Sequence, residues 1–246
     1  MHPLLAELTD EPAFMLGCSL GASIGFHVAV DHPGQISALI AHEPVAPRLL
    51  PADQRAHHEQ ESAHIQEVHR REGLAATFKV VAEVLGIDPA DRGVEPGLTP
   101  QPMTSQRVRN FDFFVEHDFA AVIGDTLDVS ALAGTPTRIV PCAGRTTPRT
   151  VFDNKCAFAL ADLLGTDLHE FPGGHNGNTA RPSAYAAAVR TVLDASEVLT
   201  RGSAHEARRL LGRESTAFRL KVDSRKSRFR VGALRKIKLR MRRARC

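Results

Sequence analysis

The hydrophobic positions of the chain fall into short apolar runs separated by longer, helix-like stretches. Three runs of strand length cover Phe14–Gly17, Ile36–Ala41 and residues 137–143. Residues 167–171 alternate between polar and apolar side chains, which is also typical of a strand. Runs that are apolar throughout indicate strands covered on both faces. The pattern therefore predicts an α/β fold with a mostly parallel sheet flanked by helices.

Helical patterns surround these strands. Residues 1–10 have apolar side chains at positions 4, 5 and 8, a helical spacing. Small and apolar residues predict a helix over 21–30, which the turn Pro33-Gly34 ends. Residues 151–164 and 183–199 are predicted as helices after the third and fourth strands.

The stretch between the second and third strands has a different character. Residues 52–72 are polar and favour a helix, residues 74–85 are more apolar and also helical, and residues 89–102 form a connector rich in proline and glycine. Residues 108–123 carry four phenylalanines, most of which we expect in the core.

The first strand leads into Gly17-Cys18-Ser19-Leu20-Gly21, a G-x-S-x-G sequence between a strand and a helix. In such a nucleophile elbow the serine lies at the apex of a strained turn. We expect that a Cβ on Gly17 or Gly21 would collide with the adjoining elements. Ser19 would then be exposed beside a helix N-terminus, and the amide of Leu20 would be free to donate to an oxyanion. Cys18, next to the serine, is expected to face inward and to pack rather than react.

This context resembles the α/β-hydrolase family from about Pro12 to Leu199. Residues 31–40 are similar to that family's helix end, turn and next strand, and residues 171–177 (FPGGHNG) are similar to its histidine loop. The resemblance implies a partial α/β-hydrolase fold with its core in residues 1–50 and 126–199, a helical lid insertion in 51–125 and a basic tail in 200–246. It also implies an N-terminally truncated chain, because family members carry further strands upstream, including the loop that gives the second oxyanion-hole amide. Either the chain is a shortened version or its other half comes from elsewhere.

The resemblance further implies a Ser-His-acid triad with Ser19 as nucleophile and His175 as base. In most members the acid follows the third of these strands, but the loop 144–149 holds no carboxylate. Asp153 is the first acid downstream, within the predicted helix. Glu43 is the better candidate, because it lies at the tip of the second strand, where some branches of the family place the acid.

The function implied is a serine hydrolase for an ester or similar acyl substrate, esterase-like and without a cofactor or metal. Phe111 and Phe114 are expected to line the acyl site under the lid. One alternative is a catalytically silent homologue that acts as a binding or vestigial protein. A second is a nucleic-acid-binding protein that relies on the tail.

The histidines of residues 52–72 raise the question of a metal site. A zinc helix of the H-E-x-x-H type that starts at His58 would need a histidine at position 62, where Ser62 stands. A solvated helix face is therefore preferred over a metal site.

Composition and charge limit the class of protein that the chain can be. The 246 residues are 43% hydrophobic, enough for a core, with no apolar run long enough to cross a bilayer and no signal-peptide plan. The four cysteines show neither CxxC spacing nor the pattern of a disulfide framework, which fits a reducing compartment. We therefore expect a cytoplasmic protein. Residues 201–246 hold 17 Lys and Arg against 3 Asp and Glu, a net +14, whereas the remainder carries −11. The tail is expected to be disordered, and its contact with nucleic acid or an anionic membrane is the less favoured reading. Self-association is expected through an uncovered edge of the first strand.

Overall fold

A computed structural model describes residues 1–87, 93–99 and 101–195. Its strands, in chain order, are β1 (Ala13–Cys18), β2 (Ile36–His42), β3 (Arg138–Gly144) and β4 (His169–Phe171). Its helices are α1 (His2–Leu8), α2 (Leu20–Asp31), α3 (Ala52–Glu72), α4 (Leu74–Val84), α5 (Ser105–Phe113), α6 (Phe119–Ile123), α7 (Phe152–Leu164), α8 (Gly177–Ala180) and residues 182–195. Short 3-10 turns cover Pro47–Leu49 and Val129–Gly134, and a π-helical turn, η2 (Phe114–Asp118), joins α5 to α6.

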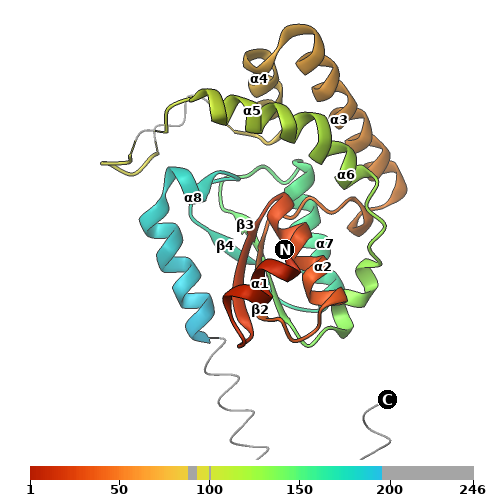
Figure 1. Cartoon of the computed structure of the whole chain (residues 1–246), viewed down its shortest axis with the longest axis vertical. Coiled ribbons are helices and arrows are strands. Elements are labelled where there is room, and N and C mark those ends of the chain that lie inside the picture. Colours follow the sequence, from red (N-terminus) through yellow and green to blue (C-terminus); the bar gives the residue numbers. More distant parts are fainter. Residues whose placement is uncertain (88–92, 100, 196–246) are drawn as a thin grey trace, which may run out of the picture. The chain divides into compact units, whose positions relative to one another are not determined.

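The strands form one sheet in the order β1-β2-β3-β4, and every neighbouring pair is parallel (Figure 1). In agreement with the mostly parallel sheet that the apolar runs predict, the first two runs lie side by side as parallel strands, with Leu16 opposite Ile40 and Cys18 opposite His42. Because parallel strands all end at the same edge, the segments that follow Cys18, His42 and Gly144 meet at the carboxyl edge of the sheet, where ligands bind in folds of this class.

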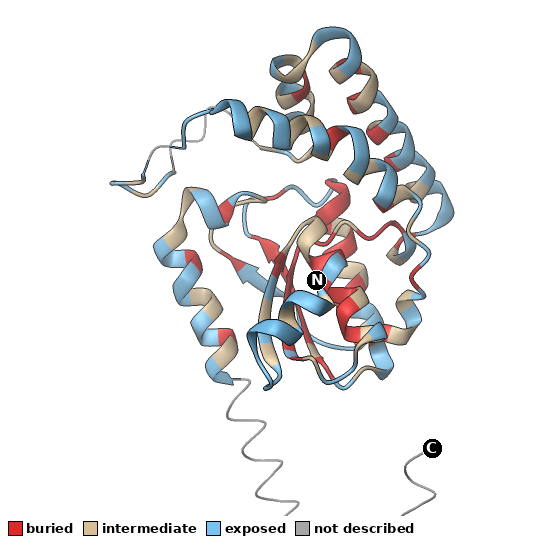
Figure 2. Cartoon of the chain, in the orientation of Figure 1, coloured by how far each residue is buried: buried red, intermediate tan, exposed pale blue. Residues whose placement is uncertain are grey.

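Two hydrophobic clusters cover the two faces of the sheet. Between them, β2 and β3 are buried over most of their length (Figure 2). Leu39 points into the cluster that contains Phe26 of α2 and Leu160 of α7. The next residue, Ile40, points into the opposite cluster, with Phe171 and Tyr185. Successive side chains on a strand alternate in this way, so the continuous apolar run of β2 is explained by burial on both faces.

Helices α3 to α6 lie together above one end of the sheet (Figure 1). The expectation that most phenylalanines of this stretch belong to the core is wrong. Phe113 is 60% exposed, and Phe111, Phe114 and Phe119 are only partly buried. The physical reason for two of these rings, Phe114 and Phe119, is that they border a cavity, which leaves part of each ring uncovered.

The prediction of a solvated face for residues 52–72 is also wrong in part. The helix α3 spans these residues, but it buries His58, Ser62, Ile65 and Val68. These positions recur at intervals of three and four residues and so lie on one face of the helix. Two of the four are polar, which is why the hydrophobic pattern alone did not reveal a buried face.

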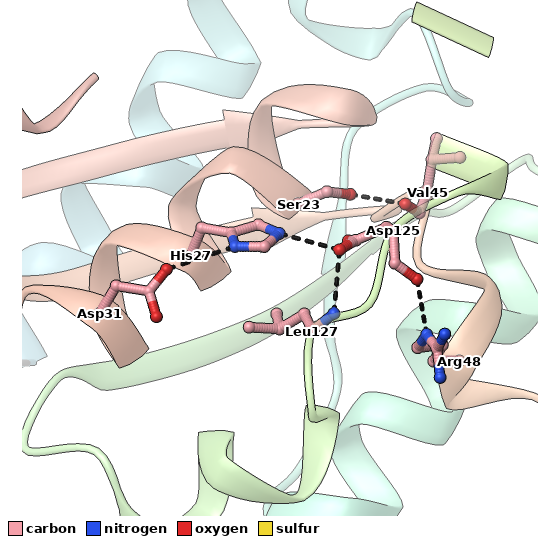
Figure 3. Close-up of polar contacts among 7 residues, drawn as sticks. All are labelled: Ser23, His27, Asp31, Val45, Arg48, Asp125 and Leu127. Carbon is pink, nitrogen blue, oxygen red and sulfur yellow. Dashed lines mark hydrogen bonds and ion pairs between the residues drawn. The ribbon is translucent and has the colours of Figure 1, made fainter. Parts of the chain in front are cut away.

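Side-chain hydrogen bonds hold both ends of the segment between β2 and β3 to α2 (Figure 3). At the start of the segment, Ser23 Oγ donates to Val45 O at 2.6 Å. At its end, His27 Nε2 lies 3.0 Å from Asp125 Oδ1, and Arg48 Nε donates to the carbonyl oxygen of Asp125. The helices above the sheet are thus tied to the helix that directly follows Ser19.

The basic tail, residues 200–246, lies outside the described residues, as does part of the predicted connector. Of the residues that the structure describes, none belongs to a helix long and apolar enough to cross a membrane.

Candidate active site

Ser19 lies in the turn between β1 and α2 with a backbone that few L-residues adopt, at φ 54° and ψ −125°. Its amide donates to His42 O at 2.9 Å, which fixes the turn against the end of β2. A Cβ on Gly17 would lie 2.6 Å from the Cα of Ala22, so the glycine is required there. The same expectation for Gly21 is wrong: a Cβ at that position would meet nothing within 4 Å. Gly21 points away from the turn, and only the first glycine of the motif is sterically needed.

Leu20 is the first residue of α2, and its side chain lines a cavity together with Ser19. Amides in the first turn of a helix have no partner within the helix. The Leu20 amide is therefore placed to donate to an oxygen next to Ser19.

Glu43 follows β2 and is completely buried. Its backbone has φ 44°, and within the described residues only Ser19 and Glu43 combine a side chain with a positive φ. Strained backbone of this kind persists where surrounding contacts enforce it, and it is concentrated at functional sites. The contacts are visible here: Glu43 Oε1 accepts hydrogen bonds from the amide of Gly144 at 2.9 Å and from Asn154 Nδ2 at 3.3 Å.

His175 faces the other oxygen of Glu43, with Nδ1 2.8 Å from Oε2. The loop that carries His175 lies against the end of β3, because Gly144 has no side chain: a Cβ there would lie 2.5 Å from the carbonyl carbon of Gly174. A third acidic group is close, since Asp153 Oδ2 lies 3.5 Å from the same His175 Nδ1. The structure thus brings His175 between two carboxyl groups at the sheet edge.

These contacts shift the pKa values of the three groups in different directions. Burial opposes the charge of His175, but the hydrogen bond to Glu43 and the nearby carboxylates raise its pKa above the usual value. Burial likewise opposes the charge of Glu43, yet the hydrogen bond from His175 and the nearby imidazoles lower its pKa. Burial raises the pKa of Asp153 to about 7, because the opposing effect of His175 is smaller than that of burial. Glu43 is therefore the ionised partner of His175, and Asp153 is largely a neutral acid below pH 7.

No hydrogen bond joins Ser19 to His175 in the part of the chain that the structure describes. A serine side chain rotates among three staggered positions, and hydrogen bonds of this kind are commonly long before substrate binds.

Comparisons with known proteins bear on the family and the fold of the chain. No family model matches the chain. The uncharacterized hydrolase YraK of Bacillus subtilis strain 168 is 32% identical over 197 residues, which cover 78% of this chain and 68% of that protein. The chain belongs to the α/β-hydrolase family.

Solved structures share the fold of this hydrolase. MenH from S. aureus superposes with a TM-score of 0.56 at 15% identity, covering 79% of this chain and 73% of that one. A structure from a study of carboxylesterases of the thaumarchaeon Nitrososphaera gargenis has a TM-score of 0.53 at 18% identity, covering 80% and 70%. A hydrolase from Pseudomonas aeruginosa has a TM-score of 0.51 at 23% identity, covering 78% and 68%.

A cavity of about 80 Å³ opens beside Ser19 in this hydrolase, between the sheet edge and the helices above it. Phe114 and Phe119 line it, from η2 and α6. Phe111 does not: its ring packs edge-on against Phe78 with centroids 4.8 Å apart, so it joins α5 to α4. Phe114, the first residue of η2, lies three residues after Phe111 and is part of the cavity wall.

Two cavity-lining residues were not assigned a role by sequence reasoning. His58 is buried, and its ring stacks on Phe152 with centroids 3.6 Å apart. Asp153 lies in the first turn of α7 and is 3% exposed. The position of each in the sequence could have revealed it. His58 shares a helix face with Ile65, and Asp153 is the first acid after the third strand.

His175 also borders a second, wider cavity of about 560 Å³, whose lining includes Thr146, Asn176 and Arg181. Cys18 contacts Tyr185, with Sγ 3.4 Å from Oη, so its side chain packs as expected. Within the described residues no group of three or more acidic, histidine or cysteine side chains could hold a metal ion.

Proposed function

We infer that this chain is a serine hydrolase that cleaves an ester or a similar acyl substrate. Ser19 is the nucleophile, His175 the general base and Glu43 the acid that orients the imidazole. The observation that carries the inference is the buried contact of 2.8 Å between His175 Nδ1 and Glu43 Oε2, at the same sheet edge as the strained turn of Ser19. A carboxylate on Nδ1 fixes the tautomer in which Nε2 can accept a proton.

The reaction follows from these roles. Ser19 Oγ attacks the acyl carbon while His175 Nε2 takes its proton, and the carbonyl oxygen becomes an oxyanion that accepts from the Leu20 amide. When the tetrahedral intermediate collapses, the bond to the leaving alcohol breaks and His175 returns the proton to that oxygen. Water then attacks the acyl-enzyme by the same route, which releases the acid and free Ser19. Glu43 stays ionised throughout and stabilises the imidazolium that forms in each half.

Each of the two cavities suits one part of the substrate. Ser19, Leu20 and Phe114 line the smaller, apolar cavity, which suits the acyl group. The wider cavity borders His175, which protonates the leaving group, and it therefore suits the alcohol.

A fluorophosphonate probe tests the proposal, because it labels only an activated serine. We expect the folded protein to be labelled on Ser19, the Ser19→Ala variant to stay unlabelled, and the exposed Ser37→Ala variant to be labelled like the wild type. The variants that are labelled should also hydrolyse 4-nitrophenyl esters, and Ser19→Ala should not.

The alternative, a catalytically silent binding protein, is favoured by one observation: Ser19 and His175 are not hydrogen-bonded in the described residues. A protein that unfolds cooperatively but fails to react with the probe would support this alternative.

A further inference from the structure

The small cavity beside Ser19 is apolar over most of its wall, with a few polar side chains. Its apolar lining comes chiefly from Val45, Ile65, Val81, Val84, Phe119 and Val122. Its volume of about 80 Å³ is several times the roughly 10–15 Å³ that one water-sized group needs, which is enough for a short acyl chain. No lysine or arginine is among the described residues that line it. A carboxylate on the acyl chain would therefore find no cation there.

Asp153 is the most deeply buried polar residue of this lining. It is 3% exposed, and its Oδ2 has no hydrogen-bond partner within the described residues. The closest charged group is His175, at 3.5 Å and already engaged by Glu43 at 2.8 Å. A buried polar atom without a partner is rare in native proteins and costs about 1–3 kcal/mol. Asp153 also lines the cavity, so a ligand atom there would lie beside its carboxyl group.

His58 is a second buried polar group of the same lining. Its side chain is 8% exposed, its Nδ1 has no hydrogen-bond partner among the described residues, and its ring stacks on Phe152, the neighbour of Asp153 in sequence. The nearest acid, Glu61, has Oε2 at 3.7 Å from this Nδ1, too far for a hydrogen bond.

Burial shifts both groups toward their uncharged forms. Burial raises the pKa of Asp153 to about 7, and burial lowers the pKa of His58 to about 4. A ligand that displaces water from the cavity increases the desolvation of Asp153 and favours its protonated form. This part of the cavity thus offers a carboxylic O–H donor and a neutral imidazole.

We propose that Asp153 binds an acceptor oxygen in the acyl part of the substrate, so that the enzyme prefers short, uncharged acyl chains that carry an ether, hydroxyl or keto oxygen. The proposal rests on the serine hydrolase function given above. Asp153 acts here as a specificity-determining residue and Glu43 as the partner of His175. The acyl chain lies against the apolar wall, and its oxygen accepts a hydrogen bond from the Asp153 carboxyl.

Matched ester pairs test this preference. 4-Nitrophenyl methoxyacetate has an ether oxygen where 4-nitrophenyl butanoate has a methylene, and the pair 3-methoxypropanoate and pentanoate moves that oxygen one bond outward. The measured quantity is the ratio of kcat/KM for the ether ester to kcat/KM for its methylene partner. Differences in intrinsic reactivity cancel when this ratio is compared between variants.

For at least one pair we expect the ratio to fall about tenfold in Asp153→Leu, which has no donor. It should change less than about twofold in Asp153→Asn, whose amide still donates. Asp162→Asn, at an exposed position of the same helix, is the control. An unchanged ratio in Asp153→Leu for both pairs, or an equal fall in Asp153→Leu and Asp153→Asn, overturns the proposal.

A binding experiment separates this proposal from the proposed function. The unreactive N-(4-nitrophenyl) amides of methoxyacetic, butanoic, 3-methoxypropanoic and pentanoic acids are titrated into Ser19→Ala by calorimetry. We expect one ether amide to bind about fivefold more tightly than its methylene partner, and Asp153→Leu in this background to abolish the difference. Equal binding within both pairs by Ser19→Ala overturns the proposal even if Asp153→Leu fails to fold. If instead the probe fails to label Ser19 while the ether amides bind more tightly, the hydrolase mechanism fails and the binding site stands.

Discussion

His175 and Glu43, separated by 132 positions in the sequence, meet at the carboxyl edge of the sheet with Nδ1 2.8 Å from Oε2. Three backbone features produce this contact. Glu43 takes a positive φ directly after β2, Gly144 allows the histidine loop to approach β3 closely, and the Gly144 amide holds the second oxygen of Glu43. The pair is therefore positioned by the scaffold and not by a flexible surface loop, as a preorganised site requires.

The two glycines of the G-x-S-x-G sequence should respond differently to substitution. A Cβ on Gly17 would lie 2.6–2.7 Å from backbone atoms of Gly21 and Ala22, so Gly17→Ala must displace the turn. We expect it to destabilise the protein by a few kcal/mol and to abolish labelling of Ser19. Gly21→Ala has open space within a helix and should leave the protein as stable or up to about 1 kcal/mol more stable. Urea unfolding of both variants measures the difference, and equal losses would contradict it.

The elements that could be predicted from the sequence are those encoded by short stretches of the chain. The four strands, the turn at Ser19 and the position of Glu43 at a strand tip follow from apolar runs and from the rule that parallel strands share an edge. The carboxylate on His175 could thus be anticipated because a strand tip is a defined place in the fold.

The rest of the cavity depends on how the helices pack over the sheet. His58 lies in a polar sequence and yet is buried, because its ring stacks on Phe152, 94 positions later. Phe111 and Phe114 lie only three residues apart, but only the second lines the cavity, while the first packs on Phe78 of α4. Which of the two rings meets the cavity is set by tertiary contacts, for which no short-range pattern exists.

The stability of the protein should depend on pH through His58. Burial lowers its pKa from 6.5 to about 4, so between these values the unfolded chain binds a proton that the folded protein does not. The contribution is complete above pH 6.5 and is lost as the pH falls toward 4, with a slope of up to about 1.4 kcal/mol per pH unit. Burial also lowers the pKa of His42 to about 4, so His42 changes the stability in the same direction. Burial raises the pKa of Asp153 to about 7, so Asp153 acts in the opposite direction.

A variant isolates the part due to His58. His58→Phe keeps the ring stack on Phe152 and removes the titrating group. The pH dependence of the unfolding free energy between pH 4.5 and 6.5, measured in urea, should change by about one proton. His64→Gln, at an exposed position of the same helix, is the control. An unchanged slope in His58→Phe would show that the folded protein protonates this histidine.

The free edge of β1 should support self-association. Among the described residues β1 pairs with β2 alone, and Phe14 and Leu16 are 48% and 43% exposed. An apolar edge strand is a template for pairing with another chain, and a charge on it opposes that pairing. We expect the wild type to elute as a dimer or larger species in size-exclusion chromatography and Phe14→Lys to shift toward the monomer. Leu163→Lys, on α7, should behave as the wild type, and a monomeric wild type would refute the prediction.

The pH profile of activity should reflect the raised pKa of His175. Catalysis needs the neutral imidazole, so kcat/KM falls as the pH drops through this pKa, which the Glu43 contact holds above 6.5 despite burial. In Glu43→Gln the carboxylate is gone, and the acid limb of the residual activity should move to lower pH. Profiles of kcat/KM from pH 5 to 9 measure the shift. A limb that stays in place would mean that Glu43 does not control the charge of His175.

Two carboxyl groups face His175 Nδ1, and a substitution of each tests which of them is the acid of the proposed triad. Glu43 lies closer, at 2.8 Å against 3.5 Å for Asp153, and it is the group whose pKa is lowered. A carboxylic acid that is half neutral near pH 7 stabilises an imidazolium less than a carboxylate does, so Glu43 should carry most of the effect. Loss of such a carboxylate costs about 10⁴ in turnover in the best-known serine hydrolase triad. We expect Glu43→Gln to lose most of kcat, by a factor on the order of 10³–10⁴, and Asp153→Asn to lose far less. Steady-state kinetics with one 4-nitrophenyl ester decides between them: if Glu43→Gln retains wild-type kcat while Asp153→Asn loses it, Asp153 is the triad acid and Glu43 serves only to hold the loops around Gly144 and Asn154.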